Sequence, residues 1–256
     1  MRHPLTHQSG LHGDIFGGWI LGQHDHEFDE PLQTHDETAY RSVLPVLADQ
    51  YFTMPTETMF SYSNVGFSVL GILVERVTGQ QYGEYVERTI LDPLGMEASG
   101  LHPDQFEREH LAMGYPTGRG GPEPYARIRD VPAGSIAAGL DDMGRFMQML
   151  LQDGSPVLSR RTCIEMGRRQ NESVALDGKS AVGLTFWLNN PTEIPDLKLM
   201  SHSGDLPPYH TVLVSAPEDK VALFVATNRN GRRGSDPGDR GGWHPPPRLG
   251  EARRFL

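Results

Sequence analysis

The sequence predicts an α+β fold in which helices pack against an antiparallel sheet. Segments with helical periodicity and capping residues fill the first 180 positions, and short segments rich in Val, Leu, Phe and Thr follow them. This order, helices first and strands afterwards, is typical of α+β domains. A chain of 256 residues is also long enough to bury a sizeable hydrophobic core.

The first helices are expected close to the N-terminus. Residues 5–11, Leu-Thr-His-Gln-Ser-Gly-Leu, are predicted to end a helix, with Gly10 as its stop because glycine readily adopts the left-handed conformation. A further helix is expected from Glu37 to about Asp49.

Residues 64–79 predict the central helix of the domain. Asn64 is expected to cap its N-terminus, and Gly79 to take the left-handed position after its last turn. Apolar residues leave this helix almost no polar face, so it is expected in the interior. Tyr62 comes just before its first turn, where free N–H groups and the positive end of the helix dipole face outward. This helix mouth is therefore a candidate place for chemistry.

Two more helices are predicted before the strands. The first runs from Tyr82 to Ile90 and is expected to stop at Pro93, with Leu94-Gly95-Met96 as a packed turn. The second is expected to be capped by Asp141 or Asp142 and ended by Gly154. Its core-facing residues recur at helical spacing, namely Met143, Phe146, Met147, Leu150 and Leu151.

An antiparallel meander is predicted after residue 180. The expected strands are Ala181–Leu188, Leu197–Ser201, His210–Ser215 and Val221–Thr227, and Ala216–Asp219 reads as the turn between the last two. The stretch Ser201–Pro207 lies just before this hairpin. Its Gly204 sits among polar residues, which would let a ligand approach the strand edge closely.

The composition argues against a nucleic-acid partner and against a membrane span. The formal net charge is −10, and no apolar run approaches the roughly 20 residues that a bilayer crossing needs. The opening residues, Met-Arg-His-Pro, lack the apolar segment of a signal peptide, so the chain as written carries no export signal, which reads as cytoplasmic, and its true compartment is left open. The single cysteine, Cys163, excludes an internal disulfide and is interpreted as a small buried thiol on a short helix.

Two segments have unusual compositions. Residues 24–37, HDHEFDEPLQTHDE, could bind a metal ion through imidazole and carboxylate groups, but their spacing is not that of known zinc or iron sites, so a solvated acidic loop is favoured. Residues 231–256 contain six Gly and four Pro and are expected to form a disordered tail.

Two short motifs and their surroundings resemble one enzyme superfamily. Tyr62-Ser63-Asn64 at a helix mouth and His202-Ser203-Gly204 on a strand are similar to the second and third motifs of serine β-lactamases and penicillin-binding proteins, in their class C-like and esterase branch. Four further blocks occur in the family's order, namely residues 5–11, 91–96, 132–135 and 221–228. The resemblance implies that residues 1–230 form a β-lactamase-like domain.

The resemblance also implies acyl transfer through a serine ester, with hydrolysis of a lactam, an ester or an amide. Tyr62 would act as the base toward the nucleophile, and Asn64 would hold the carbonyl side of a small-molecule acyl substrate. His202 would bind the acid group of the substrate or support Tyr62. Together with Ser203 and Gly204, Asp205 would line the substrate edge, and its backbone N–H would be one oxyanion donor. No cofactor and no metal are implied, and the oligomeric state is left open.

The first motif of that superfamily, Ser-x-x-Lys, is missing from the sequence. The residues three positions before the only lysines, Lys179, Lys198 and Lys220, are Leu, Pro and Pro. The nucleophile, its lysine and one oxyanion N–H are therefore expected to be absent, along with the nucleophile helix and the first strands. That loss is expected to expose apolar surface between Val65 and Val77.

The sequence therefore predicts a β-lactamase-related serine hydrolase that is truncated and inactive as this chain. The alternatives are a non-catalytic protein that binds a ligand in the same cleft and, more remotely, a metal protein built on residues 24–37. A replacement nucleophile is sought among the serines of the resembling blocks, Ser9, Ser63, Ser135 and Ser203. Ser203 is the best of them, although it neighbours His202 on a strand and should point to the opposite face.

Overall fold

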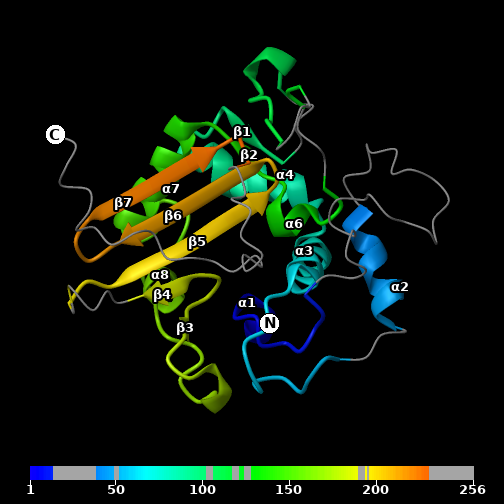
Figure 1. The fold of residues 1–256 in the computed structure, drawn as a ribbon, viewed down its shortest axis with the longest axis vertical. Coiled ribbons are helices and arrows are strands. Elements are labelled where there is room, and N and C mark those ends of the chain that lie inside the picture. The colour runs from blue at the N-terminus through cyan, green and yellow to red at the C-terminus, as the bar shows by residue number, and fades with distance from the viewer. Residues whose placement is uncertain are drawn as a thin grey trace.

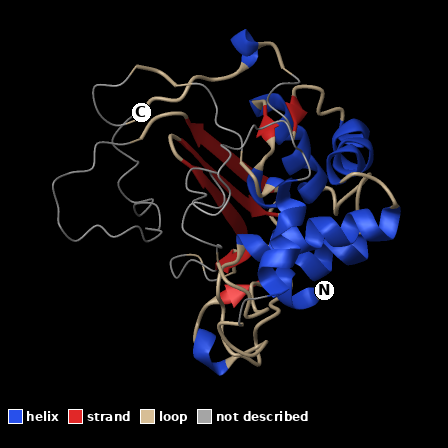
Figure 2. Cartoon of the chain, turned by 90° about the vertical axis from the view of Figure 1, so that its right-hand side faces the viewer, coloured by secondary structure: helices blue, strands red, loops and turns tan. Residues whose placement is uncertain are grey.

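A computed structural model describes residues 1–13, 39–48, 52–101, 106–116, 121–123, 128–189, 194 and 196–230. Within these residues, a group of helices lies beside a five-stranded antiparallel sheet (Figures 1 and 2). The predicted α+β fold with helices on an antiparallel sheet is thus confirmed. The expected tail at 231–256 and the acidic segment 24–37 lie outside the described residues.

The sheet has the strand order β3-β4-β5-β6-β7, and every neighbouring pair is antiparallel. Its strands are β3 (Ala181–Val182), β4 (Trp187–Asn189), β5 (Leu199–Leu206), β6 (Tyr209–Ala216) and β7 (Val221–Thr227). The Asp219 N–H donates to the Ala216 carbonyl at 3.1 Å, which confirms the predicted turn before β7. One long strand at 181–188 was a wrong prediction, because the chain turns at Thr185, whose φ is 76°, and splits the segment into β3 and β4.

Strand β5 extends further than the sequence indicates. It was expected to end at Ser201, but it pairs with β6 through Leu206, and the tight connection at Pro207 and Pro208 joins the two strands. On its other side, β5 pairs with β4 only along Leu199–Ser201. Among the described residues, the remaining part of β5 therefore has a strand partner on one side only, and the other edge faces the helices (Figure 1).

The N-terminal helices are short. Helix α1 covers Arg2–Leu5, a 3-10 turn covers Ala39–Ser42, and α2 covers Val43–Ala48. Gly10 is not the stop of α1, because the left-handed residue after that helix is His7, with φ of 55°. Gly10, with φ of 73°, instead lets the chain pass the Met54 carbonyl, whose oxygen would lie 2.0 Å from an added Cβ.

The central helix, α3 (Asn64–Thr78), has the predicted position. Gly79 ends it in the left-handed conformation as expected, with φ of 71°. The predicted cap is wrong by one residue: Ser63 is the N-cap, and its hydroxyl accepts from the Gly66 N–H at 3.0 Å. The reason is local, since Ser63 is still extended whereas Asn64 already has helical geometry.

The following helix continues past its predicted end. Helix α4 (Tyr82–Val86) passes into a π-helical turn (Glu87–Leu91) and then into α5 (Asp92–Leu94), so Pro93 lies inside the helical segment. The wider π turn tolerates the missing N–H of proline, and left-handed Gly95 ends the helix instead. Met96 is buried, which confirms the packed turn.

The last two α-helices cover one face of the sheet. The short elements β1 (Ser99–Gly100), a 3-10 turn (Arg108–His110), α6 (Val131–Gly134) and β2 (Ala137–Ala138) lead to α7 (Leu140–Leu151) and α8 (Arg160–Met166), and a last 3-10 turn covers Ala175–Asp177. Gly139, not Asp141 or Asp142, occupies the cap position of α7. Asp142 is buried and accepts from the Ala98 N–H and the Ser99 hydroxyl, both at 2.8 Å.

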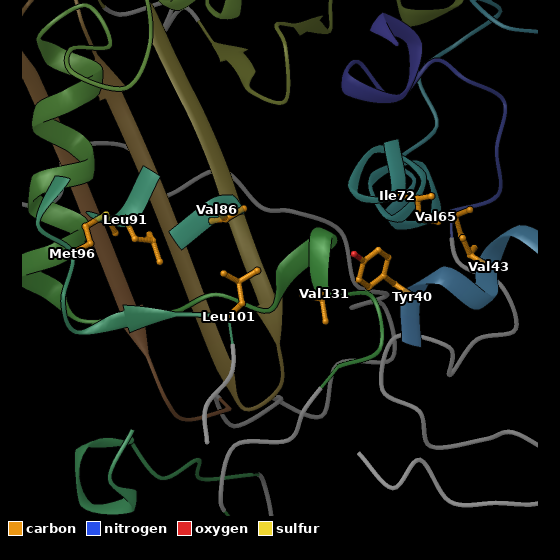
Figure 3. Packing of buried hydrophobic residues seen from close by; sticks show 9 residues of the cluster. All are labelled: Tyr40, Val43, Val65, Ile72, Val86, Leu91, Met96, Leu101 and Val131. Atoms are coloured by element: carbon orange, nitrogen blue, oxygen red, sulfur yellow. The ribbon is translucent and has the colours of Figure 1, made fainter. Parts of the chain in front are cut away.

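Two hydrophobic clusters hold these layers together. The first joins α3 to the surrounding helices (Figure 3) through Tyr40, Val43, Val65, Ile72, Val86, Leu91, Met96, Leu101 and Val131. The second joins α7 to the sheet through Met149, Leu150, Phe186, Met200 and Leu213, with Met143, Phe146 and Met147 against it, as the helical spacing predicted. Cys163 is buried in α8, also as predicted.

Apolar side chains of α3 were expected to be exposed between Val65 and Val77, and this prediction is correct only at the C-terminal end of the helix. Val65 and Ile72 are buried in the first cluster, whereas Val77 is 76% exposed. The prediction was wrong for the buried pair because α2 and the 3-10 turn before it supply Tyr40 and Val43 as packing partners. None of the helices in the described part of the chain has the length and apolar composition of a membrane span.

Candidate active site

The structure brings Tyr62 and His202 together, although they come from distant parts of the chain. Tyr62 lies at the mouth of α3 and His202 on β5, and their ring centroids are 6.4 Å apart. Asn64 begins α3 two residues after Tyr62, and its backbone N–H donates to the Gly13 carbonyl at 2.9 Å. The helix mouth and the half-open edge of β5 therefore face one another, as the two motifs predict.

Ser203, Gly204 and Asp205 continue β5 beyond His202 and are all exposed. Gly204 pairs with Thr211, whose hydroxyl oxygen would lie 2.5 Å from an added Cβ. A side chain at this position would therefore require the Thr211 hydroxyl to move. The Asp205 side chain contacts the His210 ring, with 2.7 Å between Oδ1 and Nδ1. The side chain of Asp205 is thus engaged with β6, and only its backbone N–H is a candidate donor to substrate.

His7 lies under Tyr62 and had no predicted role. Its ring stacks on the phenol, with centroids 4.2 Å apart and an interplanar angle of 27°. Its Nδ1 accepts from the Ser63 N–H at 3.0 Å, and the residue is 2% exposed. His7 therefore packs against Tyr62 and is bonded to the next residue of the motif.

Asp177 fixes the segment that carries Tyr62. Its carboxylate accepts from the Phe60 N–H at 2.5 Å and from the side-chain amides of Asn171 at 2.7 Å and Gln8 at 3.3 Å. Phe60 also packs on Trp187 of β4, with ring centroids 4.6 Å apart. Three segments of the chain are thus tied together two residues before Tyr62.

The aromatic groups of this site are uncharged at neutral pH. Partial burial raises the pKa of Tyr62 above its usual value. Burial and, to a smaller extent, the nearby His202 together lower the pKa of His7 to about 4. Burial also lowers the pKa of His202, against an opposing interaction with the Ser203 backbone. No positive charge from these imidazoles is therefore available to stabilise a phenolate at Tyr62.

The four serines of the motif blocks differ in their surroundings. Ser9, Ser63 and Ser135 are buried, and each hydroxyl is engaged with backbone. Ser203 is exposed on β5. It neighbours His202, but adjacent residues on a strand project to opposite faces, so a Ser-His pair is not formed there.

Metal binding has no support in the described residues, which contain no group of three or more His, Cys, Asp or Glu side chains that could hold an ion. The segment proposed for such a site, 24–37, lies outside them. Of the residues that sequence reasoning missed, His7 belongs to the resembling block 5–11, which is the signal that would have pointed to it. Asp177 belongs to no motif, and nothing in the sequence indicates its contacts.

Solved structures that share this fold include penicillin-binding protein homologues and a β-lactamase/D-alanine carboxypeptidase. The chain belongs to the Beta-lactamase family, whose model matches residues 1–243. This result confirms the superfamily that the Tyr-Ser-Asn and His-Ser-Gly motifs predict.

Individual relatives are distant. Penicillin-binding protein 4* of Bacillus subtilis is 24% identical over 249 residues, covering 90% of this chain and 51% of that protein. An octameric penicillin-binding protein homologue from Pyrococcus abyssi superposes with a TM-score of 0.72 at 24% identity, over 89% of this chain and 51% of the other. A β-lactamase/D-alanine carboxypeptidase from Yersinia pestis gives a TM-score of 0.68 at 23% identity, over 89% and 63%. The chain spans about half the length or less of the curated relatives it matches.

Proposed function

We propose that this chain supplies two sides of the acyl-transfer pocket of a β-lactamase-related serine hydrolase, one at Tyr62 and one at His202. We also propose that the sequence, as it stands, forms no serine ester. The observation behind the proposal is the approach of Tyr62 to His202 at the mouth of α3 and the open edge of β5. The sequence has no Ser-x-x-Lys, so this pocket has neither that nucleophile nor its lysine.

The electrostatics support the absence of catalysis. A free phenol has a pKa near 10, and making it a base near pH 7 takes about 4 kcal/mol of differential stabilisation. A neighbouring cation would normally supply this, yet burial moves the Tyr62 pKa the other way and keeps His7 and His202 neutral. Tyr62 is therefore a protonated phenol in this chain.

Covalent labelling tests the proposal directly. The chain is incubated with benzylpenicillin and, separately, with a fluorophosphonate probe, and its intact mass is measured, with trypsin as the control for the fluorophosphonate. We expect no mass increase. An adduct would overturn the inactivity of the chain, and its loss in Ser203→Ala would identify Ser203 as the nucleophile.

A second labelling experiment tests the pocket itself. An N-terminal segment that bears Ser-x-x-Lys is fused to the chain. We expect the benzylpenicillin adduct to appear on the added serine and to form at least tenfold more slowly in Tyr62→Phe. Labelling at the same rate in both would remove Tyr62 from the chemistry.

The second candidate function is ligand binding without turnover, and the uncharged pocket favours it. Neutral imidazole and phenol groups still bind polar ligands through hydrogen bonds. Calorimetric titration with benzylpenicillin, D-alanyl-D-alanine and a D-amino acid amide would then give saturable heats. These heats should disappear in Tyr62→Ala and persist in Tyr115→Ala, which truncates another exposed tyrosine. Flat titrations with all three probes would count against this function.

A further inference from the structure

His7 is an unusual residue to bury at this position. It is 2% exposed, and its Nε2 has no hydrogen-bond partner within the described part of the chain. A buried N–H without a partner destabilises a fold, and a hydrocarbon ring of similar size would avoid that cost. The imidazole of His7 is therefore expected to make a hydrogen bond that a hydrocarbon ring could not make.

The His7 ring makes its hydrogen bond through the other ring nitrogen, Nδ1. Nδ1 accepts from the Ser63 N–H at 3.0 Å, so it carries no proton and the neutral ring bears its hydrogen on Nε2. Ser63 is also the N-cap of α3 and the neighbour of Tyr62. The same ring stacks on Tyr62 at 4.2 Å between centroids.

His7 contacts the motif from a separate segment of the chain. Helix α1 and the residues that follow it lie beside the N-terminal end of α3 (Figure 1). Two backbone bonds join the same segments, from the Ser61 N–H to the His7 carbonyl at 2.8 Å and from the Asn64 N–H to the Gly13 carbonyl at 2.9 Å. His7 is therefore tied to the Tyr62 segment through its backbone, one ring nitrogen and its ring face.

We infer that His7 is a positioning residue of the pocket: its neutral ring, fixed by the Ser63 N–H, holds the Tyr62 phenol against the His202 side of the site. The inference rests on the proposed function only in treating Tyr62 as a pocket residue. The low pKa of His7, about 4, is consistent with a ring that stays neutral at physiological pH.

Nitrogen-15 NMR of the histidine rings tests the tautomer in the unaltered protein, with His7→Asn used to assign the His7 signals. At pH 7 we expect His7 to show an unprotonated Nδ1 and a protonated Nε2. The opposite tautomer, or a ring that exchanges between the two, would overturn the inference. This measurement remains decisive if the variant fails to fold, because the other ring signals can be assigned by their through-space contacts.

The Tyr62 phenol provides the second readout, through ¹³C NMR titration of labelled tyrosine with Tyr62→Phe for assignment. His7→Asn keeps an acceptor for the Ser63 N–H but removes the stacked ring. We expect the raised pKa of Tyr62 to fall toward its ordinary value in the folded variant, because loss of the stacked ring lets water reach the phenol. His3→Asn, the same change at an exposed histidine of α1, should leave it unaltered.

An unchanged Tyr62 pKa in folded His7→Asn would refute a positioning role. Neither readout uses an acyl ligand, so its outcome is separate from that of the binding and labelling experiments.

Discussion

At the scale of single residues, burial decides the charge of the pocket. Asp177 binds three donors, and His7 and Tyr62 stack, yet none of these contacts brings a cation to the phenol. The motif residues are therefore arranged for hydrogen bonding and packing. Their protonation states follow mainly from desolvation, with a smaller contribution at His7 from the nearby His202.

The buried His7 makes stability depend on pH. Its pKa is about 4 in the folded chain and near 6.5 when unfolded, so between these values the unfolded state binds the extra proton. We expect the free energy of unfolding to be greatest above about pH 6.5 and to fall by about 3 kcal/mol as the pH drops to 4. His202 acts in the same direction, because its pKa is also lowered.

Urea denaturation between pH 7.5 and 4 measures this dependence. His7→Asn should flatten the profile by removing the share of His7, whereas His3→Asn should leave the slope as it is. Equal slopes in the native chain and His7→Asn would mean that His7 is not the group responsible.

Asp177 gives a second prediction at this scale. Asp177→Ala leaves the Phe60 N–H and two side-chain amides without their acceptor, which should lower the free energy of unfolding by about 3 kcal/mol. Asp196→Ala removes a carboxylate from an exposed position and should change stability by less than about 0.5 kcal/mol. Chemical denaturation compares the two, and equal effects would show that the Asp177 bonds contribute nothing specific.

At the scale of elements, the ends of helices decide where the site residues lie. Ser63 caps α3, and its hydroxyl also donates to the His12 carbonyl at 2.6 Å. A one-residue shift of the cap, from Asn64 to Ser63, places Asn64 in the first helical turn. The cap residue Ser63 is the direct neighbour of Tyr62. The stability of the first turn of α3 and the position of the Tyr62 side chain are therefore linked.

Substitutions at the cap test that correction. Ser63→Ala should lower the free energy of unfolding by about 1–2 kcal/mol, because it removes one accepted and one donated bond. Asn64→Ala should cost less than half as much, since Asn64 is not the cap. Thermal and urea unfolding of both variants provide the comparison, and a larger loss in Asn64→Ala would restore Asn64 as the cap.

At the scale of the whole molecule, the two faces of the sheet differ. Helices α7 and α8 cover one face through the second hydrophobic cluster (Figure 1). On the other face, apolar side chains of β6 and β7 are exposed at fractions of 41–62%, namely Val212, Val221, Leu223 and Val225. Strand β7 also has a strand partner only in β6 among the described residues. An apolar edge strand of this kind promotes association with other chains.

A charge on this face should reduce self-association. Leu223→Lys is expected to shift sedimentation velocity profiles toward the monomer at concentrations at which the unaltered chain forms larger species. Ile164→Lys places the same charge at an exposed apolar residue of α8 and should have little effect. If both variants sediment like the unaltered chain, the β7 face is not the cause of association.

Local signals were enough to predict much of this molecule. Helix α3, its left-handed Gly79, the spacing in α7 and the turn before β7 all depend on residues close in sequence. The boundaries were less accurate where a wider helical turn accommodated Pro93, or where a turn at Thr185 divided a predicted strand. Such details depend on backbone geometry that residue type constrains only weakly.

The sequence by itself determined the α+β class, the family and the two motifs that supply Tyr62, Asn64 and His202. Only the tertiary structure decided that His7 lies under Tyr62 and that Asp177 holds the segment before it. The physical reason is that these contacts join residues far apart in the chain. Periodicity and capping describe how each segment folds, whereas burial and the protonation states that follow from it depend on which segments meet.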